Sequence, residues 1–196
     1  MDYESTSNLI LINPTKLEQD LREALKSYRY PNKATKAILA NVEKIKDEYE
    51  GNLHNIYTLS VENNLGTPNN VAETLKKISL EVWRRVNDFY WYGSKKAGVF
   101  IRELVTQGLW NLSLEDIPIP ADSRVRRVLF RLGLVEERNN LKEVEEAARE
   151  LSKKAKITSL DLDYVLWFVG DEQICGERKA LCGRCPLEVF CPKGSR

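Results

Sequence analysis

The chain has 196 residues, enough to bury one full hydrophobic core or to form two small lobes. Hydrophobic residues make up 42% and charged residues 30%, the ordinary balance of a soluble globular protein. Because the formal charge is only +1, no overall field forces a nucleic-acid partner, and any basic surface must be local. A single histidine, His54, lies far in sequence from the four cysteines, so histidine-based metal catalysis is nearly excluded.

The N-terminal segment has only a short apolar run, at residues 9–12, after an acidic start. That run is too short for a signal peptide or a membrane span. We therefore expect a cytoplasmic protein with no membrane partner. In such a reducing compartment, clustered cysteines are more often metal ligands than disulfides.

Most of the chain shows the 3.6-residue apolar period of amphipathic helices. Helices are predicted over residues 14–30, 33–50, 53–61, 71–92, 95–105, 123–132, 141–155 and 159–169. The polar, breaker-rich stretch at 62–70 is the clearest internal boundary, and residues 114–122 form a proline-bearing loop. No alternating strand pattern persists, so the predicted fold class is all-α, with helices packed against their sequence neighbours.

All four cysteines lie in one stretch, with the spacing Cys175-x6-Cys182-x2-Cys185-x5-Cys191. A C-x2-C pair presents two thiolates to one centre from a tight turn, and the flanking loops bring in the outer two. On geometry alone, tetrahedral zinc and a cubane iron–sulfur cluster satisfy this pattern equally well. Zinc sites more often repeat a short pair, and this pattern has only one. The remaining alternative is four unrelated free or disulfide-bonded cysteines.

The cysteine pattern resembles the [4Fe–4S] loop of the endonuclease III branch of the helix-hairpin-helix DNA glycosylases. This resemblance implies a [4Fe–4S] cofactor instead of zinc, in a site that is structural and positions DNA. It also implies the two-lobed helical fold of that family. In the family, the first six-residue gap carries basic residues that contact DNA phosphate, and Arg178 and Lys179 match that position. The alternative for these two residues is a solvated loop.

A glycosylase that also cleaves the strand needs an amine that attacks the sugar C1′ and forms a Schiff base, which permits β-elimination. Residues 93–97, G-S-K-K-A, look like the glycine-x-lysine-x-alanine of the family's hairpin, which puts Lys95 on the catalytic lysine. We expect Gly93 in a tight turn, Ser94 as the N-cap and both lysines in the opening turn of a helix. There the helix N-terminus and the neighbouring cation would lower the pKa of the amine. Lys96 is that neighbour and the second choice for the nucleophile, and Gly93, Ser94 and Lys96 are expected to contact DNA.

The same chemistry needs a carboxylate that deprotonates the nucleophile and stabilises the oxocarbenium-like charge on the sugar. Asp122 stands immediately before a predicted helix, in a stretch similar to the family's aspartate-x-histidine/arginine motif, and we expect it to be catalytic. Taken alone, it would be an N-cap. The arginines that follow, including Arg124 and Arg127, are expected to form a basic face that meets DNA phosphates; their alternative is a solvated helix side.

Two features depart from the endonuclease III pattern. The family's hairpin reads leucine-proline-glycine-x-glycine, and residues 89–93 read F-Y-W-Y-G, without the proline and the first glycine. These aromatics would either stack against the flipped-out nucleotide or pack between helices. The long interval from Lys95 to Asp122 and the phrase I-P-I-P-A-D-S-R are similar to the archaeal 8-oxoguanine glycosylases.

These resemblances imply a base-excision-repair DNA glycosylase with AP-lyase activity. It would act as a monomer on double-stranded DNA that carries a damaged base or an AP site. The expected target is an oxidised base, either 8-oxoguanine or an oxidised pyrimidine. We expect residues 1–65 to contribute to the cluster-bearing lobe, 66–135 to form the central lobe and 136–196 to hold the C-terminal helices and the cluster loop. The alternatives are a uracil or thymine mismatch glycosylase of the same fold, a non-catalytic iron–sulfur DNA-binding module, and a zinc-bound structural protein.

Overall fold

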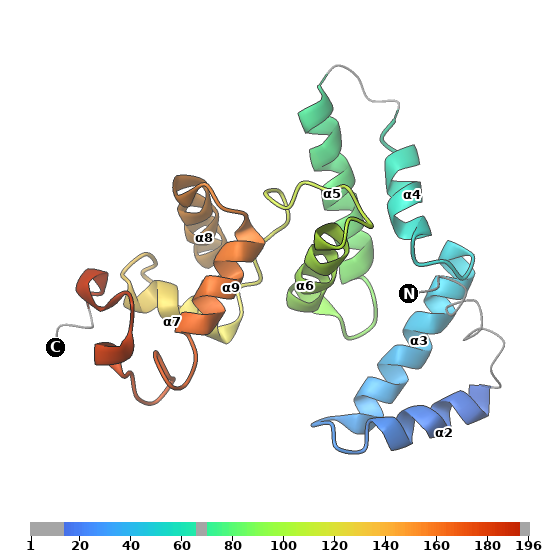
Figure 1. Cartoon of the computed structure of the whole chain (residues 1–196), viewed down its shortest axis with the longest axis horizontal. Coiled ribbons are helices and arrows are strands. Elements are labelled where there is room, and N and C mark those ends of the chain that lie inside the picture. The colour runs from blue at the N-terminus through green and yellow to red at the C-terminus, as the bar shows by residue number, and fades with distance from the viewer. Residues whose placement is uncertain (1–13, 66–69, 193–196) are drawn as a thin grey trace.

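The computed structural model describes residues 14–65 and 70–192, and over these residues it confirms an all-helical chain (Figure 1). The first four helices are α2 (Pro14–Ala24), α3 (Pro31–Tyr49), α4 (Asn55–Glu62) and α5 (Val71–Asn87). They are followed by α6 (Gly93–Thr106), α7 (Ser123–Arg131), α8 (Leu141–Ala155) and α9 (Ser159–Val169). Two short 3-10 turns, Cys182–Arg184 and Glu188–Phe190, shape the cysteine loop. The apolar run at 9–12 and part of the boundary at 62–70 lie outside the described residues. No described helix combines the length and the apolar character that crossing a membrane requires.

The buried side chains fall into two clusters, which define two lobes. The first cluster joins the end of α3 to α4, α5 and α6; it includes Tyr49, Ile56, Val82, Val86, Phe89, Ile101 and Trp110. The second joins α7, α8 and α9; it includes Val125, Val128, Leu129, Val144, Leu162 and Leu166. Figure 1 shows the cysteine loop beyond α7 and α9, at the end of the molecule opposite to α2 and α3.

This division of the core differs from the expected one. Residues 1–65 were expected to pack with the cysteine-bearing lobe, but α4 packs against α5, and the C-terminal end of α3 joins the same core. The physical reason is that Tyr49 and Ile56, 2% and 0% exposed, share one core with Val82 and Val86. The boundary between the lobes falls between Ile117 and Ile119, inside the proline-bearing loop, and not at 66 or 136.

The two lobes meet where α6 crosses α9. Gly98 of α6 is buried there, and a Cβ atom at this position would lie only 3.0 Å from Leu160 Cδ2 of α9 and 3.7 Å from Pro120 Cγ. Because glycine has no side chain, α9 and the loop before α7 approach the first turns of α6 closely. This approach brings the N-terminus of α6 beside the N-terminus of α7.

The turn between α5 and α6 follows an early end of α5. The apolar period predicted a helix to residue 92, but α5 stops at Asn87 and the next residues form an irregular turn. Phe89 is buried and lies 6.3 Å from Tyr49 and 5.9 Å from Tyr92, ring centre to ring centre. These two aromatics of the F-Y-W-Y run therefore pack between helices.

Candidate active site

The structure brings Lys95 and Asp122 together, although 27 residues separate them in sequence. Lys95 lies in the first turn of α6, and its Nζ donates a hydrogen bond to Asp122 Oδ2 and forms an ion pair with that carboxylate. The two side chains are 38% and 22% exposed, so solvent and a ligand of the right shape can reach both. An amine and a carboxylate in direct contact can exchange a proton without an intervening water.

Asp122 is held in place by the start of α7. Its Oδ1 accepts hydrogen bonds from the backbone amides of Arg124 and Val125, at 2.9 and 3.0 Å, so the residue is the N-cap of that helix. Burial raises the pKa of Asp122, but the hydrogen bond from Lys95 and the two amide bonds outweigh it, so the pKa lies below the ordinary value. The carboxylate is thus ionised and its orientation is fixed by the cap.

The start of α6 differs in detail from the expected one. Tyr92 stands at the N-cap position without a side-chain cap, and Gly93, at φ 68°, is the first residue of the helix, so Ser94 is not the cap. A positive φ is a conformation that glycine adopts without strain, which accounts for Gly93. Gly93 and Ser94 are both exposed.

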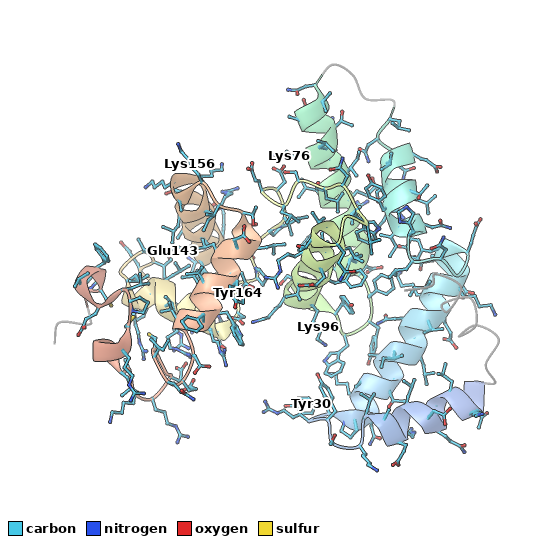
Figure 2. The ribbon with its side chains drawn as sticks, viewed as in Figure 1. Tyr30, Lys76, Lys96, Glu143, Lys156 and Tyr164 are labelled. Atoms are coloured by element: carbon cyan, nitrogen blue, oxygen red, sulfur yellow. The ribbon has the colours of Figure 1, made fainter. Side chains whose placement is uncertain are left out.

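Lys96 points away from Asp122. Its Nζ donates a hydrogen bond to the backbone oxygen of Trp91 at 2.9 Å and lies 3.8 Å from the centre of the Trp91 ring. Figure 2 shows its side chain below α6, on the side that faces the corner between α2 and α3. Of the two lysines that the sequence offered, only Lys95 contacts the carboxylate in this structure.

A second carboxylate, which the sequence analysis missed, lies beside this pair. Asp163 of α9 is 4% exposed, and its Oδ1 has no hydrogen-bond partner within the described part of the chain. Burial raises its pKa to about 6; the nearby Asp122 adds to the rise, whereas Lys95 and Arg102 oppose it. A signal was present in the sequence, because an aspartate within the nearly all-apolar helix 159–169 has no polar face on which to lie.

Aromatic side chains of α9 and arginines of the facing elements border the same site. Tyr164 and Trp167 are 58% and 39% exposed, unusual values for such large aromatic groups. Arg102 lies 6.0 Å from the Tyr164 ring centre, and Arg124 lies 4.5 Å from that of Trp167. Figure 2 shows Tyr164 on α9, at the side of the helix nearer to α6. Exposed rings next to guanidinium groups suit a ligand that has both aromatic faces and negative charge.

Arg127, expected to contact DNA, is instead buried at 3% exposure. Its guanidinium donates to the backbone oxygens of Cys175 and Gly170, at 2.8 and 2.6 Å, and to Glu177 Oε2 at 2.6 Å. A buried guanidinium requires such partners, and here they tie α7 to the start of the cysteine loop. The DNA-binding assignment of Arg127 is therefore corrected to a structural one.

Three of the other basic residues remain accessible. Arg124 is partly exposed at the start of α7, and Arg178 and Lys179 are exposed on the loop between Cys175 and Cys182. Their contact with DNA stays a prediction.

The four cysteines line one cavity of about 140 Å³, together with Arg131, Ile174, Ala180 and Glu188. All four are free thiols of intermediate exposure. Arg131 Nη1 donates to Cys175 Sγ at 3.1 Å, a contact that suits a thiolate. Among residues 14–65 and 70–192, no three cysteine, histidine, aspartate or glutamate side chains are grouped so as to hold a single metal ion.

The fold and the site together define a helical enzyme with an amine–carboxylate pair at the junction of two lobes. A family model, AGOG, described as N-glycosylase/DNA lyase, matches residues 102–192. The match supports a place in the helix-hairpin-helix DNA glycosylase superfamily, and it gives the enzyme class, an N-glycosylase with DNA lyase activity. The matched segment contains Asp122, Asp163 and the four cysteines, whereas Lys95 lies before its start. Comparisons with curated proteins and with solved structures give no match.

Proposed function

We propose that the protein is a base-excision-repair glycosylase that removes an oxidised base and then cleaves the DNA strand through a Schiff base on Lys95. The observation that carries this proposal is the direct contact between Lys95 Nζ and Asp122 Oδ2. Its DNA lyase component agrees with the class of the matching family.

The geometry supports a sequence of proton and bond changes. Asp122 takes a proton from Lys95, and the free amine attacks C1′ of the extruded nucleotide as the bond between C1′ and the base breaks. Once this proton has passed from Asp122 to the departing base, the carboxylate is ionised again and stabilises the positive charge on the sugar, with its orientation held by the cap. Opening of the sugar ring gives the Schiff base, from which loss of a C2′ proton expels the 3′ phosphate.

A base in the site would meet both polar and aromatic groups. Asp163 Oδ1 is a buried acceptor without a partner among the described residues, so a bound base that offers an N–H group would satisfy it. The exposed rings of Tyr164 and Trp167 could stack against that base. Oxidation of guanine at C8 turns the acceptor N7 into an N–H donor, which favours 8-oxoguanine; oxidised pyrimidines remain the second substrate class.

We propose that Cys175, Cys182, Cys185 and Cys191 hold a [4Fe–4S] cluster. Four sulfurs about 2.3 Å from one zinc ion would lie only about 3.8 Å apart, and the described residues show no group that fits a single ion. A cubane bonds each thiolate to a different iron, so it needs four cysteines placed around a shared cavity, and these four line one cavity. When bound, the cluster would fix the loop that carries Arg178 and Lys179, and no step of the base removal passes through it.

The cofactor is tested on the purified protein. A cluster predicts a brown protein with about four iron and four sulfide per chain. A colourless protein with one zinc would contradict it.

The function is tested with duplexes that carry an AP site, 8-oxoguanine, thymine glycol or uracil. We expect release of an oxidised base and strand cleavage by the wild type, and loss of both in Asp122→Asn. A protein that binds these duplexes but neither releases a base nor cleaves the AP site would contradict the proposal and favour a binding module.

A further inference from the structure

The turn before α6 carries a tryptophan in a conformation that favours glycine. Trp91 has φ 61°, and it stands where the related hairpins have their first glycine. A left-handed backbone is strained at a bulky residue, so contacts elsewhere must stabilise it. Among them, Asn41 of α3 fixes the neighbouring residue by two hydrogen bonds, from the Tyr90 amide at 2.7 Å and to the Tyr90 oxygen at 3.2 Å.

The corner between α2 and α3 surrounds this tryptophan with positive charge. Lys33 Nζ lies 5.1 Å from the centre of the Trp91 ring, and Lys96 Nζ approaches the same ring from α6 at 3.8 Å. The Tyr30 ring meets it edge-on at 6.4 Å. Figure 2 shows Tyr30 at the corner between α2 and α3, below Lys96 of α6. The ring therefore holds two ammonium groups together, one from each side of the turn.

One helical turn beyond Lys33, Lys36 extends the same surface, with its Nζ 5.9 Å from the Tyr90 ring centre. Lys33, Lys36 and Lys96 are all exposed, and none takes part in an ion pair within residues 14–65 and 70–192. The ammonium groups of Lys33 and Lys96 therefore repel each other without a neutralising partner in this part of the chain. Burial is the main cause that lowers the pKa of Lys96, and the charge of Lys33 is the second. Unpaired like charges held together by aromatic rings suit a polyanion.

We infer that Tyr30, Lys33, Lys36, Tyr90, Trp91 and Lys96, here named the Trp91 patch, bind the DNA backbone beside the nucleotide that Lys95 attacks. This inference rests on the proposed function for the identity of the polyanion. The placement follows from the chain itself, because Lys96 is the neighbour of Lys95 on α6 and its ammonium lies on the patch.

The patch accounts for the missing hairpin glycine. A glycine hairpin lets backbone amides approach a phosphate closely. Here a large side chain occupies that place and gathers lysine ammonium groups from two parts of the chain. Helix α3 and the residue before it thereby contribute to DNA binding, a role that the sequence of α3 does not show.

The test is DNA affinity and its salt dependence for Lys33→Ala/Lys36→Ala, measured by fluorescence anisotropy on an AP-site duplex. We expect the Kd at low salt to rise about tenfold, and the slope of log Kd against log salt to fall by about 1–2, near 0.9 for each lost phosphate contact. Lys46→Ala is the matched control, because Lys46 is also exposed on α3 but lies about 15–20 Å further along the helix axis than Lys36 and Lys33. Both substitutions remove surface lysines, so equal thermal melting points should show that the fold is intact.

The outcomes separate this inference from the proposed function. An unchanged affinity and slope in the double variant, or an equal loss in Lys46→Ala, would overturn the Trp91 patch even if the wild type cleaves AP-site DNA. If the wild type binds DNA through the patch but cleaves no substrate, the patch stands and the proposed function fails. A wild type that does not bind DNA overturns both.

Discussion

Asp122 uses one carboxylate oxygen to cap α7 and the other to accept a hydrogen bond from Lys95. The capping role fixes the geometry that the chemical role requires, so one residue links the stability of the second lobe to the site at the junction. The two roles respond differently to substitution, and this makes them separable by experiment.

Substitution at Asp122 should separate capping from chemistry. Asparagine is as good an N-cap as aspartate, whereas alanine costs about 1 kcal/mol. We therefore expect Asp122→Asn to unfold in urea close to the wild-type midpoint, Asp122→Ala to be less stable, and both to lose most of the base-release rate. Activity retained in Asp122→Asn would show that the residue is a cap and nothing more.

Asp163 should make the protein less stable as pH rises. Its folded pKa of about 6 lies above the ordinary value of 3.8, so between these values the folded state holds a proton that the unfolded state has lost. The free energy of unfolding therefore falls as pH rises through this range, and the loss is complete above about pH 6. We expect Asp163→Asn to be more stable than the wild type by about 1–2 kcal/mol at pH 7, and less active.

Urea unfolding of both proteins between pH 5 and 7.5 provides the measurement. The wild type should lose stability relative to Asp163→Asn across the lower half of this range. Parallel curves would mean that Asp163 does not titrate there. Asp122 does not interfere, since its pKa is lowered and its contribution changes only at more acidic pH.

The backbone conformation at Trp91 predicts that the glycine variant is more stable than the alanine variant, the reverse of the order in a regular helix. Both Trp91→Gly and Trp91→Ala remove the ring and its contacts with Lys33, Lys96 and Tyr30. Only glycine accepts φ 61° without strain, so Trp91→Gly should be more stable than Trp91→Ala by about 1 kcal/mol. In a regular helix the order would be reversed, which makes thermal melting of the two variants decisive.

Substitutions of Arg127 and Arg178 should have opposite effects: the first should lower stability, and the second should lower DNA affinity. Arg127→Gln breaks a buried site in which each of the three guanidinium nitrogens donates a hydrogen bond, and should destabilise the protein by about 3 kcal/mol or more. Arg178→Gln changes an exposed loop residue, so its melting temperature should stay near the wild type while its DNA affinity falls. A stable Arg127→Gln variant with weakened DNA binding would restore the role that the sequence suggested.

The sequence predicted the elements better than it predicted how they pack. The apolar period located α3, α5, α8 and α9, and the position of Asp122 before an apolar helix identified it as a cap. The period also predicted α5 beyond its true end, because Phe89 is buried and Tyr92 partly buried by the turn and not by a helix.

The roles of Arg127, Asp163 and Trp91 depend on tertiary packing, which the sequence alone does not show. Arg124 and Arg127 look alike in sequence, and only packing against the cysteine loop shows that Arg127 is enclosed. An aspartate in an apolar helix was a signal for Asp163, but its place in the site could not be predicted, because its neighbours, Lys95 and Asp122, lie far away along the chain. Trp91 contacts Lys33 of α3 as well as Lys96 of α6, and no local pattern could relate α3 to the turn before α6.

The central claim, that the Lys95 amine is the nucleophile, is tested most directly by borohydride trapping on an AP-site duplex. The reduction converts a Schiff base into a stable covalent adduct, and mass spectrometry of the digested product locates it. We predict an adduct on Lys95 in the wild type, an adduct retained in Lys96→Ala and none in Lys95→Ala. An adduct that persists in Lys95→Ala and vanishes in Lys96→Ala would contradict the account.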